Sequence, residues 1–116
     1  MHGFNRTQRV AQLLREEINT MIQRDLKDPL IGMATISEVR VTEDLKHAKV
    51  YVSIIGDEEA RTNTLRGLER ARSRIRGELG RRLDLRHIPQ LEFVLDRSAE
   101  YAQNIEALLQ KLRQNA

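Results

Sequence analysis

Apolar residues recur every three or four positions over the first part of the chain, which is the spacing of one face of an α-helix. The repeating positions are Val10, Leu13, Leu14, Ile18, Met21, Ile22 and Leu26. Asn5, with Gln8 three residues later, fits a capping box at the helix start, and Thr7 is the alternative cap. Because Pro29 disfavours the helical conformation at Asp28, we expect the helix to end before that residue.

Two stretches of alternating apolar and polar residues follow, at 33–41 and 47–55, and this period is typical of strands. The segment between them, 42–46, is too short for a crossover helix, so the two strands should form an antiparallel hairpin. The apolar positions of the first strand change parity across Ser37 and Glu38, which predicts a β-bulge or a bend. Asp57, after Gly56, can cap the next helix.

The helical stretch after Asp57 does not fit one straight helix. Its apolar stripe consists of Leu65, Leu68, Ile75, Leu79 and Leu83. A continuous helix would place Arg72 in the middle of that stripe, where an unpaired charge is costly. We therefore predict a kink at Ala71, Arg72 and Ser73 that divides the stretch into two helices.

Alternation returns after Pro89, and we expect a third strand there, followed by a last amphipathic helix capped by Ser98. The apolar stripe of this helix consists of Tyr101, Ile105, Leu108, Leu109 and Leu112. Phe93, in the strand, and Tyr101, in the helix, are both expected to lie on core stripes. The predicted order, α-β-β-α-α-β-α, indicates an α+β fold in the form of a two-layer sandwich.

A length of 116 residues with 40% apolar residues suits a single domain with one core, and we expect residues 1–4 to form a mobile tail. The sequence has no run of eighteen apolar residues and no secretory pattern, so we expect a cytoplasmic protein without a membrane segment. Cysteine is absent, which excludes disulfides, thiolate metal sites and cysteine nucleophiles.

Nothing in the sequence suggests catalysis. None of the three histidines is paired by local spacing with a carboxylate or another histidine, as a metal or catalytic site would require. Asp84 and His87 come nearest, and we interpret them as a loop pair. No phosphate-binding glycine loop of the nucleotide hydrolases is present. We predict no enzyme, no cofactor and no metal.

The net charge of +3 is modest, but arginines concentrate in residues 61–86, where the only acids are Glu69, Glu78 and Asp84. The residues predicted to contact RNA phosphates there are Arg66, Arg70, Arg74 and Arg81, helped by Arg72, Arg76 and Arg82. The alternative is an ordinary solvated helix face. Arg6 and Arg9, at the start of the first helix, are equally compatible with phosphate contacts and with solvation. Lys46 and Lys49 suit either RNA contact or protection of an edge strand.

Residues 77–80, Gly-Glu-Leu-Gly, match the spacing of the GXXG loop with which KH domains clamp nucleotides. We interpret them as two glycines within a helix, because Glu78 would repel phosphates and Leu79 belongs to the core stripe. Aromatic residues are too few for a base-stacking platform. Tyr51 faces away from Val50 and Val52, where it either stacks a base or packs under a helix.

Several short motifs occur together in a distinctive order. They are Arg9-Val10, Lys27-Asp28-Pro29, Val41-Thr42-Glu43-Asp44-Leu45, Ala48-Lys49-Val50-Tyr51-Val52-Ser53, Leu85-Arg86-His87-Ile88-Pro89-Gln90-Leu91-Glu92-Phe93 and Asp96. With these motifs the chain resembles the bacterial ribosome-binding factor A family over almost its whole length.

The resemblance implies a type II KH-like fold and an assembly factor that binds the small ribosomal subunit and its rRNA, with ribosomal proteins as further candidate contacts. Nothing in the sequence demands a dimer, so we expect a monomer. It also implies a role in late maturation and processing of small-subunit rRNA and in growth in the cold. The family replaces the glycine loop by an interhelical kink written Ala-x-Gly. The matching residues are Ala71, Arg72 and Ser73, with serine in place of the glycine.

Two other functions fit the same sequence. One is a KH-like module for other RNA, and the other is a protein-interaction adaptor that uses its sheet or final helix and does not touch RNA. Salt dependence separates the adaptor from both RNA binders. Preference for intact small subunits over naked RNA separates the assembly factor from the generic module.

Overall fold

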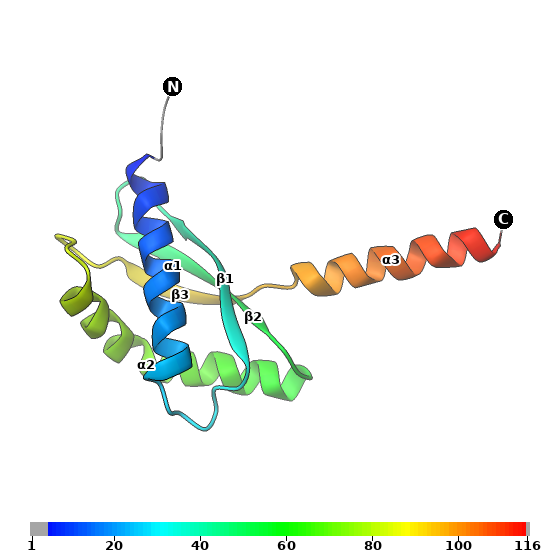
Figure 1. Ribbon diagram of the computed structural model, residues 1–116, viewed down its shortest axis with the longest axis horizontal. Coiled ribbons are helices and arrows are strands. Elements are labelled where there is room, and N and C mark those ends of the chain that lie inside the picture. Colours follow the sequence, from blue (N-terminus) through cyan, green and yellow to red (C-terminus); the bar gives the residue numbers. More distant parts are fainter. Residues whose placement is uncertain (1–4, 116) are drawn as a thin grey trace.

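A computed structural model describes residues 5–115 of the chain, and the tail predicted at 1–4 lies outside them. The elements are α1 (Arg6–Arg24), β1 (Ala34–Val41), β2 (His47–Ile54), α2 (Glu58–Arg82), β3 (Gln90–Leu95) and α3 (Ser98–Gln114). Figure 1 shows α1 and α2 against the sheet and α3 projecting away from it. The predicted α+β class and all three strands are confirmed.

The sheet is mixed, with strand order β1-β2-β3. Strands β1 and β2 pair antiparallel, as the short connection at 42–46 predicts, whereas β2 and β3 pair parallel with α2 as the crossover. The register of β1 against β2 shifts between Ile36 and Glu38, which confirms the predicted bulge. Within residues 5–115, no strand lies beside the outer side of β3, so this side is an open edge.

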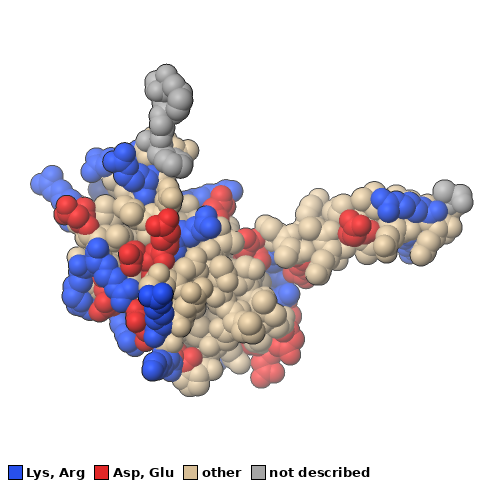
Figure 2. All heavy atoms as spheres, in the orientation of Figure 1, with Lys and Arg blue, Asp and Glu red and all other residues tan. Residues whose placement is uncertain are grey.

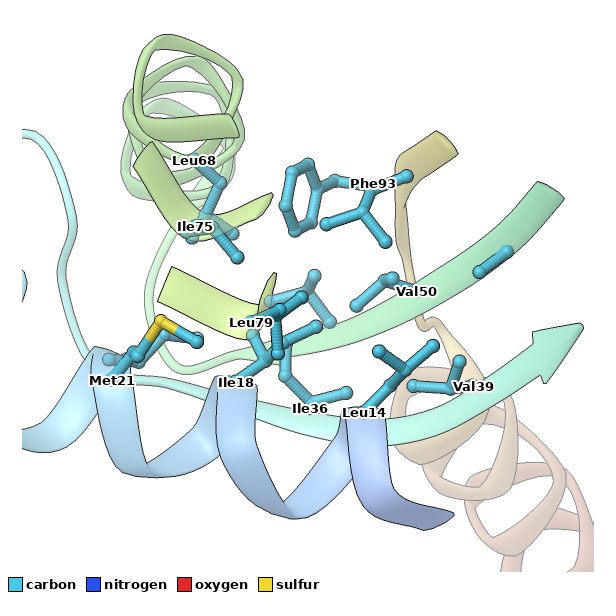
Figure 3. Close-up of a cluster of buried hydrophobic side chains, with 14 of the residues drawn as sticks. Leu14, Ile18, Met21, Ile36, Val39, Val50, Leu68, Ile75, Leu79 and Phe93 are labelled. Atoms are coloured by element: carbon cyan, nitrogen blue, oxygen red, sulfur yellow. The ribbon is translucent and has the colours of Figure 1, made fainter. Parts of the chain in front are cut away.

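The core lies between the sheet and the two helices packed on it, and Figure 3 shows side chains from both layers meeting there. The helices contribute Leu14, Ile18 and Met21 from α1 and Leu68, Ile75 and Leu79 from α2, and all six are almost completely buried. In β2, Ala48, Val50, Val52 and Ile54 are buried at every second position, so one face of the sheet is covered by α1 and α2.

Two of the predicted helix caps are confirmed and one is wrong. Asn5 Oδ1 accepts a hydrogen bond from Gln8 N at 2.9 Å, and Gln8 Oε1 accepts one from Asn5 N at 3.0 Å, which completes the capping box. Asp57 caps α2. Ser98 is the first helical residue of α3 and not its cap; its backbone amide donates instead to Asp96.

The predicted division of residues 58–82 into two helices is wrong, because α2 is a single helix by its backbone hydrogen bonds. Figure 1 shows that the axis of α2 nevertheless changes direction between its first and second halves. The Arg72 side chain is 46% exposed and pairs with Glu69 at 3.2 Å, so it does not lie in the core. A bent but continuous helix is therefore compatible with an exposed Arg72, and a break into two helices is not needed.

The expectation that Tyr101 lies on a core stripe is also wrong. No described residue of α3 is buried, and Tyr101 is 68% exposed. The start of α3 is tied to α2 by ion pairs at the surface, Arg97 to Glu58 at 3.4 Å and Arg61 to Glu100 at 3.7 Å. The described helices include none that is both long enough and apolar enough to cross a membrane.

Candidate nucleic-acid interface

The loop between α1 and β1 determines where α2 lies. Asp28 Oδ1 accepts a hydrogen bond from Leu30 N at 2.9 Å, and Ile31 N donates to Asp28 O at 3.0 Å, so the segment forms a tight turn. The other carboxylate oxygen of Asp28 pairs with Arg70 of α2 at 3.1 Å. The Lys27-Asp28-Pro29 motif is therefore part of the scaffold that holds the first half of α2.

The same loop packs directly on the backbone of α2. Gly67 faces it, and a Cβ atom at this position would lie 2.7 Å from Ile31 Cγ1 and 3.2 Å from Leu30 Cβ. One turn earlier, the buried Thr64 hydroxyl accepts a hydrogen bond from Gly32 N at 3.2 Å. The close approach of loop and helix thus depends on a residue without a side chain at position 67.

The predicted arginine face of α2 is exposed. The side chains of Arg70 and Arg81 are 62% and 68% exposed, and Arg66 is exposed and makes no ion pair with a described residue. Arg81 pairs with Glu78 one turn away, and Arg74 donates to the Asp25 carbonyl at 3.2 Å. Figure 2 shows basic and acidic side chains interleaved over the half of the domain that carries α1 and the second half of α2.

Arg76 has a different role from the exposed arginines. Its Nε donates to Pro89 O at 3.0 Å and its Nη2 donates to Ile88 O at 2.7 Å. The guanidinium is therefore used to hold the α2–β3 loop, where two carbonyl groups would otherwise lack partners. This geometry leaves Arg76 less available to phosphate than the sequence pattern suggests.

Arg82 is likewise occupied within the fold. Its guanidinium lies 2.5 Å from Asp25, 3.3 Å from Glu78 and 3.6 Å from Glu17, and its side chain is 29% exposed. The hydrogen bond that it donates to Asp25 is the main cause that raises the pKa of Arg82 above its ordinary value. Arg82 thereby joins the end of α2 to α1.

Arg72 is brought beside basic residues of the sheet that sequence reasoning did not group with it. Arg72 lines an open hollow of about 600 Å³ together with Arg40, Lys49 and Glu92. Arg40 and Lys49 are direct partners in the β1–β2 register, and the hollow also includes residues of β3, whose outer edge is open. The alternation of the two strands could have placed Arg40 and Lys49 on one face, but only the fold brings Arg72 to them.

The sheet face away from the helices carries Tyr51. The Arg40 guanidinium lies over its ring, 5.4 Å from the ring centroid, and also pairs with Glu38 at 3.1 Å. Tyr51 is half-buried. Base stacking on Tyr51 would therefore require Arg40 to move.

Arg6 and Arg9 are exposed on the first turns of α1. Figure 1 shows that this end of α1 lies at the opposite end of the domain from the first half of α2. The structure therefore does not bring Arg6 and Arg9 together with Arg66 and Arg70 on one surface.

The interpretation of residues 77–80 as helix is confirmed, because Gly77 and Gly80 lie within α2 and Leu79 is fully buried. Among the described residues, no group of three or more His, Asp or Glu side chains could hold a metal ion. Asp84 and His87 make no ion pair with each other in this part of the chain.

Comparison with known proteins gives a consistent result. The family model for ribosome-binding factor A matches residues 6–109. The ribosome-binding factor A of Brevibacillus brevis is 44% identical over 107 residues, covering 92% of this chain and 88% of that protein. The protein of the same description from Natranaerobius thermophilus is 42% identical over 107 residues, covering 92% and 82%.

Structural neighbours agree with the sequence relatives. The crystal structure of ribosome-binding factor A from Thermus thermophilus has a TM-score of 0.70 and 33% identity, covering 79% of this chain and 97% of that one. A homology model of the Thermus thermophilus factor, fitted into a cryo-electron-microscopy map of its complex with the 30S subunit, has a TM-score of 0.63 and 34% identity. It covers 75% of this chain and 91% of that one.

Proposed function

The chain belongs to the ribosome-binding factor A family, and from that premise we propose that it binds the small ribosomal subunit and assists late maturation of the subunit's rRNA. It is a non-enzymatic assembly factor. The family match over residues 6–109 is the observation that carries this proposal. We also propose that it acts in the cytoplasm, as expected for an assembly factor with bacterial relatives.

Contact with rRNA is assigned to the outer face of α2. Arg66, Arg70 and Arg81 are exposed there, and their guanidinium groups suit phosphate oxygens. The side chains of Arg70 and Arg81 are largely exposed, whereas their partners Asp28 and Glu78 are only 14% and 29% exposed. Each pair fixes the position of its arginine, and the other N–H groups of the guanidinium remain free to bind phosphate. Because phosphate contacts carry no sequence information, the protein would recognise the shape and position of rRNA.

The fold is best understood as a type II KH-like arrangement in which the bend of α2 at Ala71, Arg72 and Ser73 replaces the glycine loop. Two observations support this view. The axis of α2 changes direction along its length, and Arg72 is turned outward into the hollow with Arg40 and Lys49. A continuous bend does not need the left-handed conformation that glycine would favour, which is why serine is acceptable at position 73.

Co-sedimentation with purified small subunits tests this function. The double variant Arg66→Gln with Arg70→Gln should bind about tenfold or more weakly, as expected for the loss of two charge-assisted contacts, with an unchanged circular dichroism spectrum. Glutamine is used because glutamate at position 70 would face Asp28.

The matched control is Lys111→Gln with Arg113→Gln, which removes two exposed charges from α3 and should bind like the wild type. Equal binding of both double variants would remove the α2 face from the interface. Failure of the wild-type protein to sediment with small subunits, or equal affinity for naked RNA, would overturn the assembly-factor proposal.

A further inference from the structure

A second cavity lies at the end of the domain where the start of α1, the β1–β2 loop and the α2–β3 loop meet. Its volume is about 710 Å³, within the range of sites for small molecules. Val10, Leu45 and Ile88 line it with apolar side chains that are wholly or partly buried against the core. The cavity therefore has an apolar floor that would suit a flat, uncharged group.

Hydrogen bonds hold the walls of this cavity in place. Asp44 Oδ1 accepts from the Thr42 hydroxyl at 2.6 Å and from Lys46 N at 3.0 Å, and the first of these is the main cause that lowers the pKa of Asp44. Gln90 N donates to Lys46 O at 2.8 Å, which ties the hairpin to β3. Arg76 holds the loop on the other side through the carbonyls of Ile88 and Pro89. These hydrogen bonds join the hairpin loop, β3 and the α2–β3 loop around the cavity.

Leu45 adds a second observation. Its φ angle is 62°, in the left-handed region that residues other than glycine, asparagine, aspartate and histidine rarely adopt. This conformation directs the hairpin turn so that Leu45 packs against the core and lines the cavity. Strained backbone of this kind concentrates at functional sites, whereas a glycine would form the same turn without strain.

The rim of the cavity carries more basic than acidic side chains, with three basic residues against Glu43 and Asp44. Arg6, Lys46 and Arg86 come from three separate elements and line it, and none of the three makes an ion pair with a described residue. This contrasts with α2, where most arginines have acidic partners. Glu43 also lines the cavity, and its carboxylate could accept hydrogen bonds from the amino or imino groups of a base.

We propose that this cavity binds one unstacked nucleotide of the small-subunit rRNA, with the base on the apolar floor and the phosphate between Arg6 and Arg86. An apolar floor with uncommitted cations above it fits a base joined to a phosphate, and unpaired RNA bases are commonly bound when splayed out of the helix. The identification of the nucleotide as rRNA rests on the proposed function. This site lies apart from the α2 face and would give the protein a second point of attachment.

Titration of the isolated protein with guanosine 5′-monophosphate, followed by NMR, tests the site. The signals of Leu45, His47, Arg86 and Ile88 should shift together and saturate. Guanosine alone and ribose 5-phosphate alone should each bind at least about tenfold more weakly, because each engages only the floor or only the rim. The variant Arg6→Glu with Arg86→Glu should lose binding by a similar factor.

The control is Arg15→Glu with Arg24→Glu, which makes the same charge change at exposed positions of α1 that do not line the cavity, and it should bind the nucleotide like the wild type. Absence of saturable shifts, equal weakening by both double variants, or shifts produced only by an acidic peptide would overturn the nucleotide site. These results are independent of sedimentation with small subunits, so the nucleotide site and the proposed function can fail separately.

Discussion

Arginines on one helix differ in what they can do because each meets different neighbours. Helical periodicity correctly predicted that Arg66, Arg70 and Arg81 face outward. It could not predict that Arg76 would bind the carbonyls of Ile88 and Pro89, because that interaction depends on the path of a loop. The partner of Arg82, Asp25, is 57 residues away in the sequence. Individual roles within the arginine segment are therefore set by tertiary structure.

Two glycines of α2 give opposite predictions for the same substitution. Gly67→Ala should lower the free energy of unfolding by about 1–3 kcal/mol, because the added Cβ would lie 2.7 Å from Ile31 Cγ1. Gly77→Ala should raise it by up to about 1 kcal/mol, because a Cβ there meets nothing within 4 Å and alanine favours the helix. Urea denaturation measures both. Stabilisation by Gly67→Ala would show that the loop does not pack closely on α2.

At the scale of the elements, the spacing of apolar residues was sufficient to predict a helix or strand wherever one face of that element is buried. The helix α1, both strands of the hairpin and the bulge near Ser37 followed from periodicity and chain connection. The sequence failed where the outcome depends on geometry beyond the element. Arg72 suggested a break, but a bend of α2 was sufficient. The apolar stripe of α3 has the spacing of a core stripe, but no described residue of α3 is buried. The core is formed by the sheet with α1 and α2.

Removal of α3 should leave the domain folded. Deletion of residues 98–116 should change the free energy of unfolding by no more than about 1 kcal/mol, because the ion pair of Glu100 with Arg61 lies at the surface and no described residue of α3 is buried. Thermal and urea unfolding would measure this. The reference is Leu79→Ala in the core, which should cost about 2–5 kcal/mol. A destabilisation as large as that of Leu79→Ala on deletion would show that α3 packs on the domain.

At the scale of the whole molecule, a net charge of only +3 does not describe how the charges are distributed. Acidic residues Glu58 and Glu59 lie at the start of α2, whereas arginines crowd its later turns. The sequence predicted this arginine-rich segment but not the hollow of Arg72, Arg40 and Lys49, which unites residues from both layers. A basic surface confined to one part of the molecule attracts a polyanion to that part. The association should weaken as added salt screens the attraction between the arginines and the polyanion.

The most direct test of rRNA binding through α2 is the salt dependence of the affinity for small subunits, measured at constant magnesium. The logarithm of the binding constant should fall linearly with the logarithm of monovalent salt, by roughly 0.7–0.9 per phosphate contacted. Arg66→Gln with Arg70→Gln should reduce that slope by about 1.4–1.8, while Lys111→Gln with Arg113→Gln should leave it unchanged. An affinity that does not change with salt, or a slope unaffected by loss of Arg66 and Arg70, would contradict the account.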